Sequence, residues 1–158
     1  LPVNQKKQTL CVFAIGALGY SLIEIAARGH THWTMALTGG TCFAVLYRVN
    51  RKLRKRSTAL KCAIGSLFIT FMEFGVGLIV NRVLRWDVWD YSDRAFNLLG
   101  QICPRFTFYW LLLSLPIVYF SNLLNDRWNG PQKGIAVSEP QPDIEDNAPA
   151  PEAEKGPA

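Results

Sequence analysis

Catalytic and cofactor-binding motifs are missing from this 158-residue sequence. There is no phosphate-binding loop of the form GxxxxGKS or GxxxxGKT, which excludes nucleotide hydrolysis by the chain alone. There is also no HExxH, GxSxG or GxGxxG pattern in a suitable context. A catalytic interpretation therefore lacks a nucleophile beside a base, and we expect no cofactor.

Cysteine is scarce and dispersed. No CxxC pair occurs, so the sequence indicates neither a zinc knuckle nor a dithiol redox site. Three of the four cysteines fall inside apolar segments, where the residue usually serves as a small apolar filler. The four are Cys11, Cys42, Cys62 and Cys103.

Large apolar side chains almost disappear from Asn125 onward. This last segment contains six of the nine prolines, and its seven acids against three bases give it a net charge of −4, whereas the preceding residues carry +9. Such a composition buries too little apolar surface to offset the entropy of ordering. We therefore expect a transmembrane domain over residues 1–124 and a disordered, acidic, proline-rich tail over residues 125–158.

Four apolar runs are long enough to cross a bilayer, which takes about 20 helical residues. They cover residues 9–27, 33–49, 62–84 and 106–124, of which the second is the weakest. The first run resembles a signal peptide, but its length, Glu24 within it and the later spans favour a retained helix. The sequence thus predicts an all-α integral membrane protein, a four-helix transmembrane bundle.

Lysine and arginine are concentrated in one loop and at the N-terminus, which predicts that these parts are cytoplasmic. With four spans the C-terminus lies on the same side. The RKLRKR run at residues 51–56 could also bind anionic headgroups of membrane lipids. Because the topological signal already explains the run, we expect no nucleic-acid partner.

Glu73 lies near the middle of the third span, where an ionisable group is costly. At helical spacing around it are Ser66, Thr70, Gly77 and Asn81, a polar stripe that should face other helices rather than lipid. Two interpretations stay open. The carboxyl group either locks the bundle by hydrogen bonds, or it binds a cation, a proton or a substrate headgroup.

Polar residues also surround the end of the first span. Glu24 and Arg28 stand at i, i+4 and can form an ion pair. His30 and His32 follow at i, i+2, a weak metal-ligand spacing, so that no metal site is predicted. We interpret this segment as an interfacial turn with Trp33 anchored at headgroup level.

The segment from Arg85 to Gln101 is too polar to span and too aromatic for a plain linker. It predicts an amphipathic or re-entrant element before the last helix. This element either caps the bundle over Glu73 and Glu24 or offers a surface for lipid headgroups or a partner. Its candidate functional residues are Trp89, Asp90, Tyr91, Ser92 and Asn97.

Three strings resemble a known family: EIAARGHTHWTMALTGG, MEFGVGLIVNRVL and VWDYSDRAFNLLGQIC. Together with the apolar span that follows, they are similar to the CmpB-type membrane proteins, labelled "putative ABC-transporter type IV", and to eukaryotic transmembrane proteins of similar length. The most specific parts are Glu73, Phe74 and Gly77 and the block from Trp89 to Ser92. The resemblance implies a multi-span protein of a bacterial-type inner membrane or a plasma membrane, with a permease-like role and no defined substrate.

The sequence leaves three functions open. The first is a small permease-like transport component with a midmembrane carboxylate, which would need a homo-oligomer or a partner membrane subunit to build a pathway. The alternative is a non-catalytic lipid-interacting or scaffold protein. The third is an intramembrane enzyme that modifies lipids with Glu24, Glu73, His30, His32 or Asp90 as acid–base groups.

Overall fold

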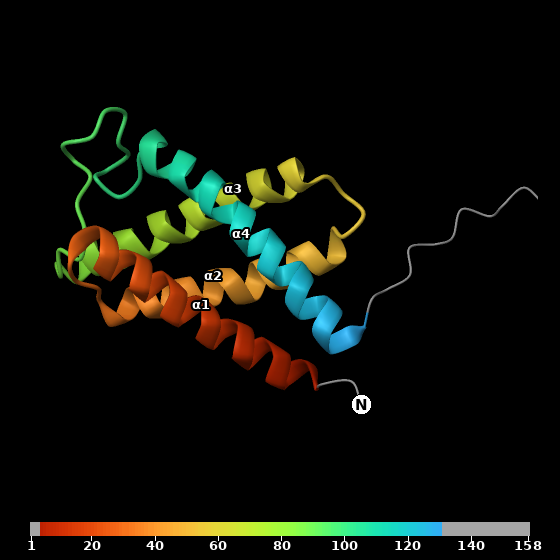
Figure 1. Ribbon diagram of the computed structural model, residues 1–158. Helices are drawn as coiled ribbons and strands as arrows, with labels where there is room; N and C mark the ends of the chain where they lie inside the picture. The colour runs from red at the N-terminus through yellow and green to blue at the C-terminus, as the bar shows by residue number, and fades with distance from the viewer. Residues whose placement is uncertain (1–3, 131–158) are drawn as a thin grey trace, which may run out of the picture.

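The computed structural model describes residues 4–130, which form a bundle of four helices (Figure 1). These are α1 (Gln5–Arg28), α2 (Trp33–Lys52), α3 (Thr58–Gly77), which continues as the π-helix η1 (Leu78–Val83), and α4 (Pro104–Asn129). Within residues 4–130 there is no strand, only an isolated bridge between Leu98 and Ile102. The predicted all-α membrane bundle is confirmed. The part of the predicted tail after residue 130 lies outside the described residues.

Each helix is longer than the apolar run that predicted it, when η1 is counted with α3. In α1, the Asn4 side chain accepts a hydrogen bond from the Lys6 backbone at the start, and Gly29 ends the helix with a φ of 76°. The last helix continues to Asn129 rather than ending at residue 124. Its final turns still pack on the bundle, since the Trp128 ring meets the Tyr47 ring edge-on with centroids 6.1 Å apart.

Within residues 4–130, three helical segments are long and apolar enough to cross a membrane: α1, α3 together with η1, and α4. The chain is therefore an integral membrane protein. By contrast, α2 is more polar, and ten of its residues are buried, including Thr34, Thr38 and Asn50. A helix surrounded by other helices needs little apolar surface of its own, which explains why its run was the weakest in the sequence.

Glycines bring α1 and α2 into close contact. A Cβ on Gly39 would lie 2.4 Å from the Tyr20 Cβ, and one on Gly16 would lie 2.5 Å from the Phe43 Cβ. Small residues allow this kind of approach in membrane bundles. Among the helices that the structure describes, the backbone of α1 comes close only to α2, whereas α4 packs against both α2 and α3. A lateral gap between the backbones of α1 and α4 follows from this arrangement.

The antiparallel helices define two ends of the bundle (Figure 1). At one end lie the start of α1, the basic connection between α2 and α3, and the end of α4. Contacts join these parts: Arg48 donates a hydrogen bond to the Thr9 hydroxyl (3.1 Å), and Arg54 pairs with Asp126 (2.6 Å). The turn at residues 29–32 and the long loop at residues 84–103 lie at the opposite end.

Candidate functional site

Glu73 is the buried centre of the site, with 3% of its surface exposed. One carboxylate oxygen accepts a hydrogen bond from Trp110 Nε1 of α4 (2.7 Å), and the other accepts one from the Tyr91 hydroxyl (3.1 Å). Within residues 4–130 no lysine, arginine or histidine forms an ion pair with it. Glu73 is thus held by neutral donors and lacks a cationic partner in the described part of the chain.

The polar stripe of α3 was predicted to face other helices, and the helix that it contacts is α4. The Ser66 hydroxyl donates to the Thr107 carbonyl oxygen (2.7 Å), and the Thr70 hydroxyl donates to the Thr107 hydroxyl (3.2 Å). Further along the stripe, Gly77 leaves room for the 84–103 loop, because a Cβ there would lie 2.5 Å from the Gln101 Oε1. The stripe therefore fixes α3 against α4 and leads from Ser66 past Glu73 to the loop.

We call residues 84–103 the cap, since this loop folds over one end of the bundle (Figure 1). It is a sequence of turns rather than an amphipathic helix. Asn81, at the end of the stripe, attaches it by three hydrogen bonds. Its amide donates to the Trp89 carbonyl oxygen (2.9 Å) and the Gln101 Oε1 (2.8 Å), and its carbonyl oxygen accepts from the Val88 backbone (2.7 Å). How deep the cap lies in a membrane stays a prediction.

The remaining candidates in the cap bond to one another. Asp90 accepts hydrogen bonds from the backbone and the hydroxyl of Ser92, which hold the pKa of Asp90 below its usual value. Asn97 donates to the carbonyl oxygens of Ser92 (3.1 Å) and Arg94 (2.8 Å) and accepts from the Gly100 backbone (3.0 Å). These residues shape the loop, whereas Tyr91 alone connects it directly to Glu73.

Glu24 and Arg28 form the predicted ion pair, with 2.9 Å between Nη1 and Oε1. Glu24 also accepts a hydrogen bond from the Thr31 hydroxyl (3.0 Å). The second guanidinium nitrogen of Arg28 donates to the Val88 carbonyl oxygen. The pair therefore ties α1 to the cap and differs from Glu73, which has no such partner.

The histidines lie at the turn between α1 and α2. His30 bonds to the Arg28 carbonyl oxygen (3.0 Å), and His32 caps α2 by accepting from the Thr34 backbone. Trp33 is 59% exposed, and its ring lies 5.9 Å from that of Trp86. In residues 4–130, no group of three or more His, Cys, Asp or Glu side chains is arranged to hold a metal ion.

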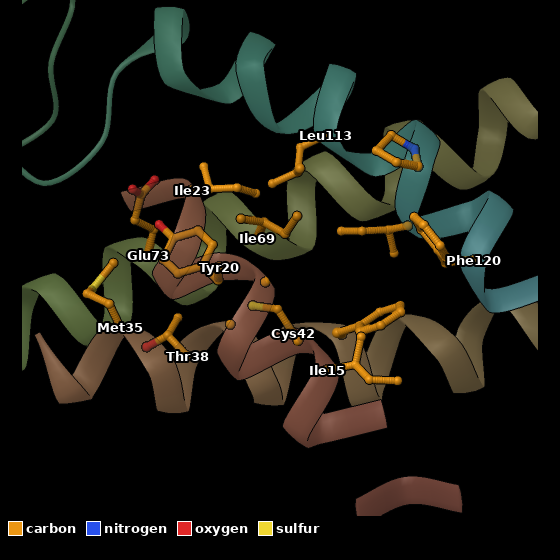
Figure 2. Close-up of a pocket in the computed structure, with 16 residues that line it drawn as sticks. Ile15, Tyr20, Ile23, Met35, Thr38, Cys42, Ile69, Glu73, Leu113 and Phe120 are labelled. Atoms are coloured by element: carbon orange, nitrogen blue, oxygen red, sulfur yellow. The ribbon is translucent and has the colours of Figure 1, made fainter. Parts of the chain in front are cut away.

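A cavity of about 280 Å³ occupies the gap between α1 and α4, and we call it the groove. Figure 2 shows Glu73 and the Tyr20 hydroxyl at one end of it and Ile15 and Phe120 toward the other. Glu73 is its single ionisable carboxyl group, and most other lining side chains are apolar. The lining comprises Ile15, Gly16, Gly19, Tyr20 and Ile23 of α1, Met35, Thr38, Gly39, Cys42 and Phe43 of α2, Ile69 and Glu73 of α3, and Leu113, Pro116, Ile117 and Phe120 of α4.

Two residues of this site were not among the predicted candidates, Trp110 and Tyr20. The rings of the two contact each other with centroids 6.0 Å apart, so they bridge α1 and α4 beside Glu73. The sequence contained one feature that could have identified Trp110 as part of the site. An indole N–H inside a membrane span needs an acceptor, and carboxylates are rare at that depth.

The region from residue 24 to residue 135 matches the family model ABC_trans_CmpB, described as "Putative ABC-transporter type IV". The match includes Glu24, Glu73, the cap and all of α2, α3 and α4. No solved structure is significantly similar to the chain. Since the matched region is well over half of the sequence, the chain belongs to the CmpB family of membrane proteins.

Proposed function

We propose that this protein is a small permease-like transport component, in which a ligand enters the groove and interacts with Glu73. The observation that carries the proposal is the position of a buried carboxyl group at the end of an apolar groove between two membrane-spanning helices. A carboxylate at such depth usually serves a substrate or ion pathway. The family description, which relates the chain to ABC transporters, supports the same role.

The groove offers lateral access. It lies between α1 and α4, whose backbones do not approach each other, and both helices belong to the three that can cross a membrane. A groove on one side of a small bundle makes an incomplete pathway. We therefore propose that the protein works as a homo-oligomer or with a partner membrane subunit whose helices complete the path.

The distribution of lysine and arginine supports one orientation of the protein in the membrane. The end with the start of α1 and the connection between α2 and α3 carries Lys6, Lys7 and most of the arginines and lysines of residues 48–61. Basic residues accumulate on the cytoplasmic side and attract anionic lipids there. In this proposal both termini are cytoplasmic, in a bacterial-type inner membrane or a plasma membrane, and the cap faces the opposite side.

A lipid-interacting or scaffold role is the second candidate. The hydrogen bonds from Trp110 and Tyr91 to Glu73 favour it, because they show that the carboxyl group also joins α3, α4 and the cap. The enzymatic interpretation has less support. His30, His32 and Asp90 bond to their own neighbours, and none of them bonds to Glu73 within residues 4–130.

Two measurements test the transport proposal. Native mass spectrometry of the protein, extracted gently from its own membrane, should detect a homo-oligomer or a complex with a second membrane subunit or an ATPase. The complete assembly in proteoliposomes should then give substrate-induced currents on a solid-supported membrane, in a screen of cationic, anionic and neutral organic solutes.

Glu73→Gln should abolish these currents while the amount of folded protein stays normal. Thr70→Val is a matched control, since it removes one hydrogen bond of the same stripe outside the groove and should keep them. A monomer that carries only lipids and gives no current with any solute would favour the scaffold interpretation and contradict the proposal.

A further inference from the structure

We propose that the groove binds an amphiphilic organic cation, with an ammonium head at Glu73 and an apolar chain between α1 and α4. This inference rests on the proposed function and names the substrate class for the same site. Three features carry it: the carboxyl group of Glu73, which forms no ion pair within residues 4–130, the hydroxyl of Tyr20 at the same end of the groove, and the apolar walls that lead away from both.

The first feature is charge. A buried carboxylate is stable when a cation and hydrogen-bond donors compensate its lost hydration. Glu73 has the donors, Trp110 and Tyr91, but no ion pair within residues 4–130. Each carboxylate oxygen uses one of its acceptor positions and can accept further bonds. A cationic head in the groove would supply the compensation that is missing.

The second feature is Tyr20. Its hydroxyl lies at the same end of the groove as Glu73 (Figure 2), close enough for an electrostatic interaction with it, and it forms no hydrogen bond within residues 4–130. An ammonium group carries several donors, so it can bond to the hydroxyl oxygen and the carboxylate together. The Tyr20 ring adds a face that attracts cations. Carboxylate, hydroxyl and ring thus form a polar end that suits an ammonium head.

The third feature is the shape of the rest of the groove. The α1 wall from Ile15 to Ile23 extends about 12 Å at 1.5 Å per residue. Ile15, Ile23 and Phe120 are 41%, 45% and 51% exposed, so the edges of the groove face the bilayer. An inorganic cation would leave these walls without contacts, and a neutral lipid would leave Glu73 uncompensated. A cation with an apolar chain matches both ends.

The test uses the full chain in nanodiscs of phosphatidylcholine. Two probes of equal length are compared, dodecylamine and dodecanol, each with a photoreactive diazirine on its chain. Near neutral pH the amine is protonated and the alcohol is uncharged. After illumination, mass spectrometry of the peptides locates the attached probe. Labelling by the amine should concentrate on residues 15–23 of α1 and 113–120 of α4, at least about tenfold above labelling by the alcohol.

Glu73→Gln removes the ionisable carboxyl group and keeps the shape of the side chain. The glutamine carbonyl oxygen can accept from Trp110 and its amide can donate to the Tyr91 oxygen, so both internal bonds survive. Amine labelling should fall to the level of the alcohol.

Gly19→Leu is an independent variant. A Cβ at Gly19 meets nothing within 4 Å and the residue lines the groove, so leucine should fill it and reduce labelling by both probes. Gly75→Leu is its matched control, because Gly75 is equally open but lies outside the groove, and labelling should stay at the wild-type level.

The inference is overturned if Glu73→Gln keeps the preference for the amine, if the alcohol labels the groove as strongly as the amine, or if Gly19→Leu changes nothing. Its failure is separable from failure of the transport proposal. A substrate-induced current for an anionic or neutral solute, without amine labelling, would contradict the inference of a cationic ligand and still support the transport proposal. Amine labelling without any current would leave a binding site and refute transport.

Discussion

Replacement of Asn81 by alanine should loosen the attachment of the cap to the bundle, because Asn81 makes three of the hydrogen bonds that hold it. The Asn81 side chain is 8% exposed and makes all three of its bonds to the cap, with the Trp89 carbonyl, the Gln101 side chain and the Val88 backbone. Alanine leaves the Trp89 carbonyl and the Gln101 side chain without these bonds in a buried place, where water replaces them poorly, and the Val88 backbone without its bond in a partly buried one.

The expected loss in the free energy of unfolding follows from the number of hydrogen bonds that the variant removes. With about 1 kcal/mol for each buried partner that loses its bond and less for the partly buried Val88 backbone, Asn81→Ala should lower the free energy of unfolding by about 2–3 kcal/mol. Asn97 is a matched comparison, because its side chain also makes three hydrogen bonds, but in the more exposed part of the cap. Water can replace those bonds, so Asn97→Ala should cost about 1 kcal/mol or less.

Unfolding of the purified protein by sodium dodecyl sulfate in mixed micelles measures both free energies. Limited proteolysis in nanodiscs then reports where the structure opens, and cleavage in residues 84–103 should increase more in Asn81→Ala than in Asn97→Ala. Equal costs for the two variants, or a cost below about 1 kcal/mol for Asn81→Ala, would refute the reasoning from burial.

Four further variants test other parts of the structure. Gly39→Ala should destabilise the bundle by about 1–3 kcal/mol, because its Cβ would collide with α1, whereas Gly75→Ala, with open space around it, should be neutral in the same unfolding assay. Trp128→Ala removes the edge-on ring contact of α4 with α2 and should cost about 1–2 kcal/mol in that assay. Asp90 has a lowered pKa, so its contribution to the cap should be full above about pH 4 and should be lost as the pH falls through that lowered pKa. Ser92→Ala should bring the Asp90 pKa back toward its ordinary value in an NMR titration, and an unchanged pKa would contradict the assigned cause.

Local patterns in the sequence predicted the local features of the structure. The polar stripe on α3 and the pair of Glu24 with Arg28 depend on helical spacing alone, and both are present. The end of α4 was placed too early because hydropathy falls after Leu124. Polar and aromatic residues such as Asn125 and Trp128 continue the helix there by packing on the bundle, which a hydropathy window does not register.

Contacts between distant segments could not be predicted in the same way. Trp110 is 37 residues from Glu73, and Tyr91 is 18 residues from it, so helical periodicity says nothing about either bond. The cap has no period of its own, and four residues other than glycine adopt positive φ there, namely Arg85, Asp87, Phe96 and Leu99. Such conformations are held by the surrounding bonds rather than by local preference.

The surroundings of Glu73 make the structural and the functional interpretations compatible. Two neutral donors fix the position of its carboxyl group and connect α3 with α4 and the cap, yet no cation forms an ion pair with it within residues 4–130. A site that served only to hold the bundle would work as well with glutamine, which keeps both bonds. The ability of the carboxyl group to carry a negative charge therefore distinguishes the two roles. Stability should follow the hydrogen bonds of residue 73, whereas ligand binding should follow its charge, and Glu73→Gln separates these quantities in one protein.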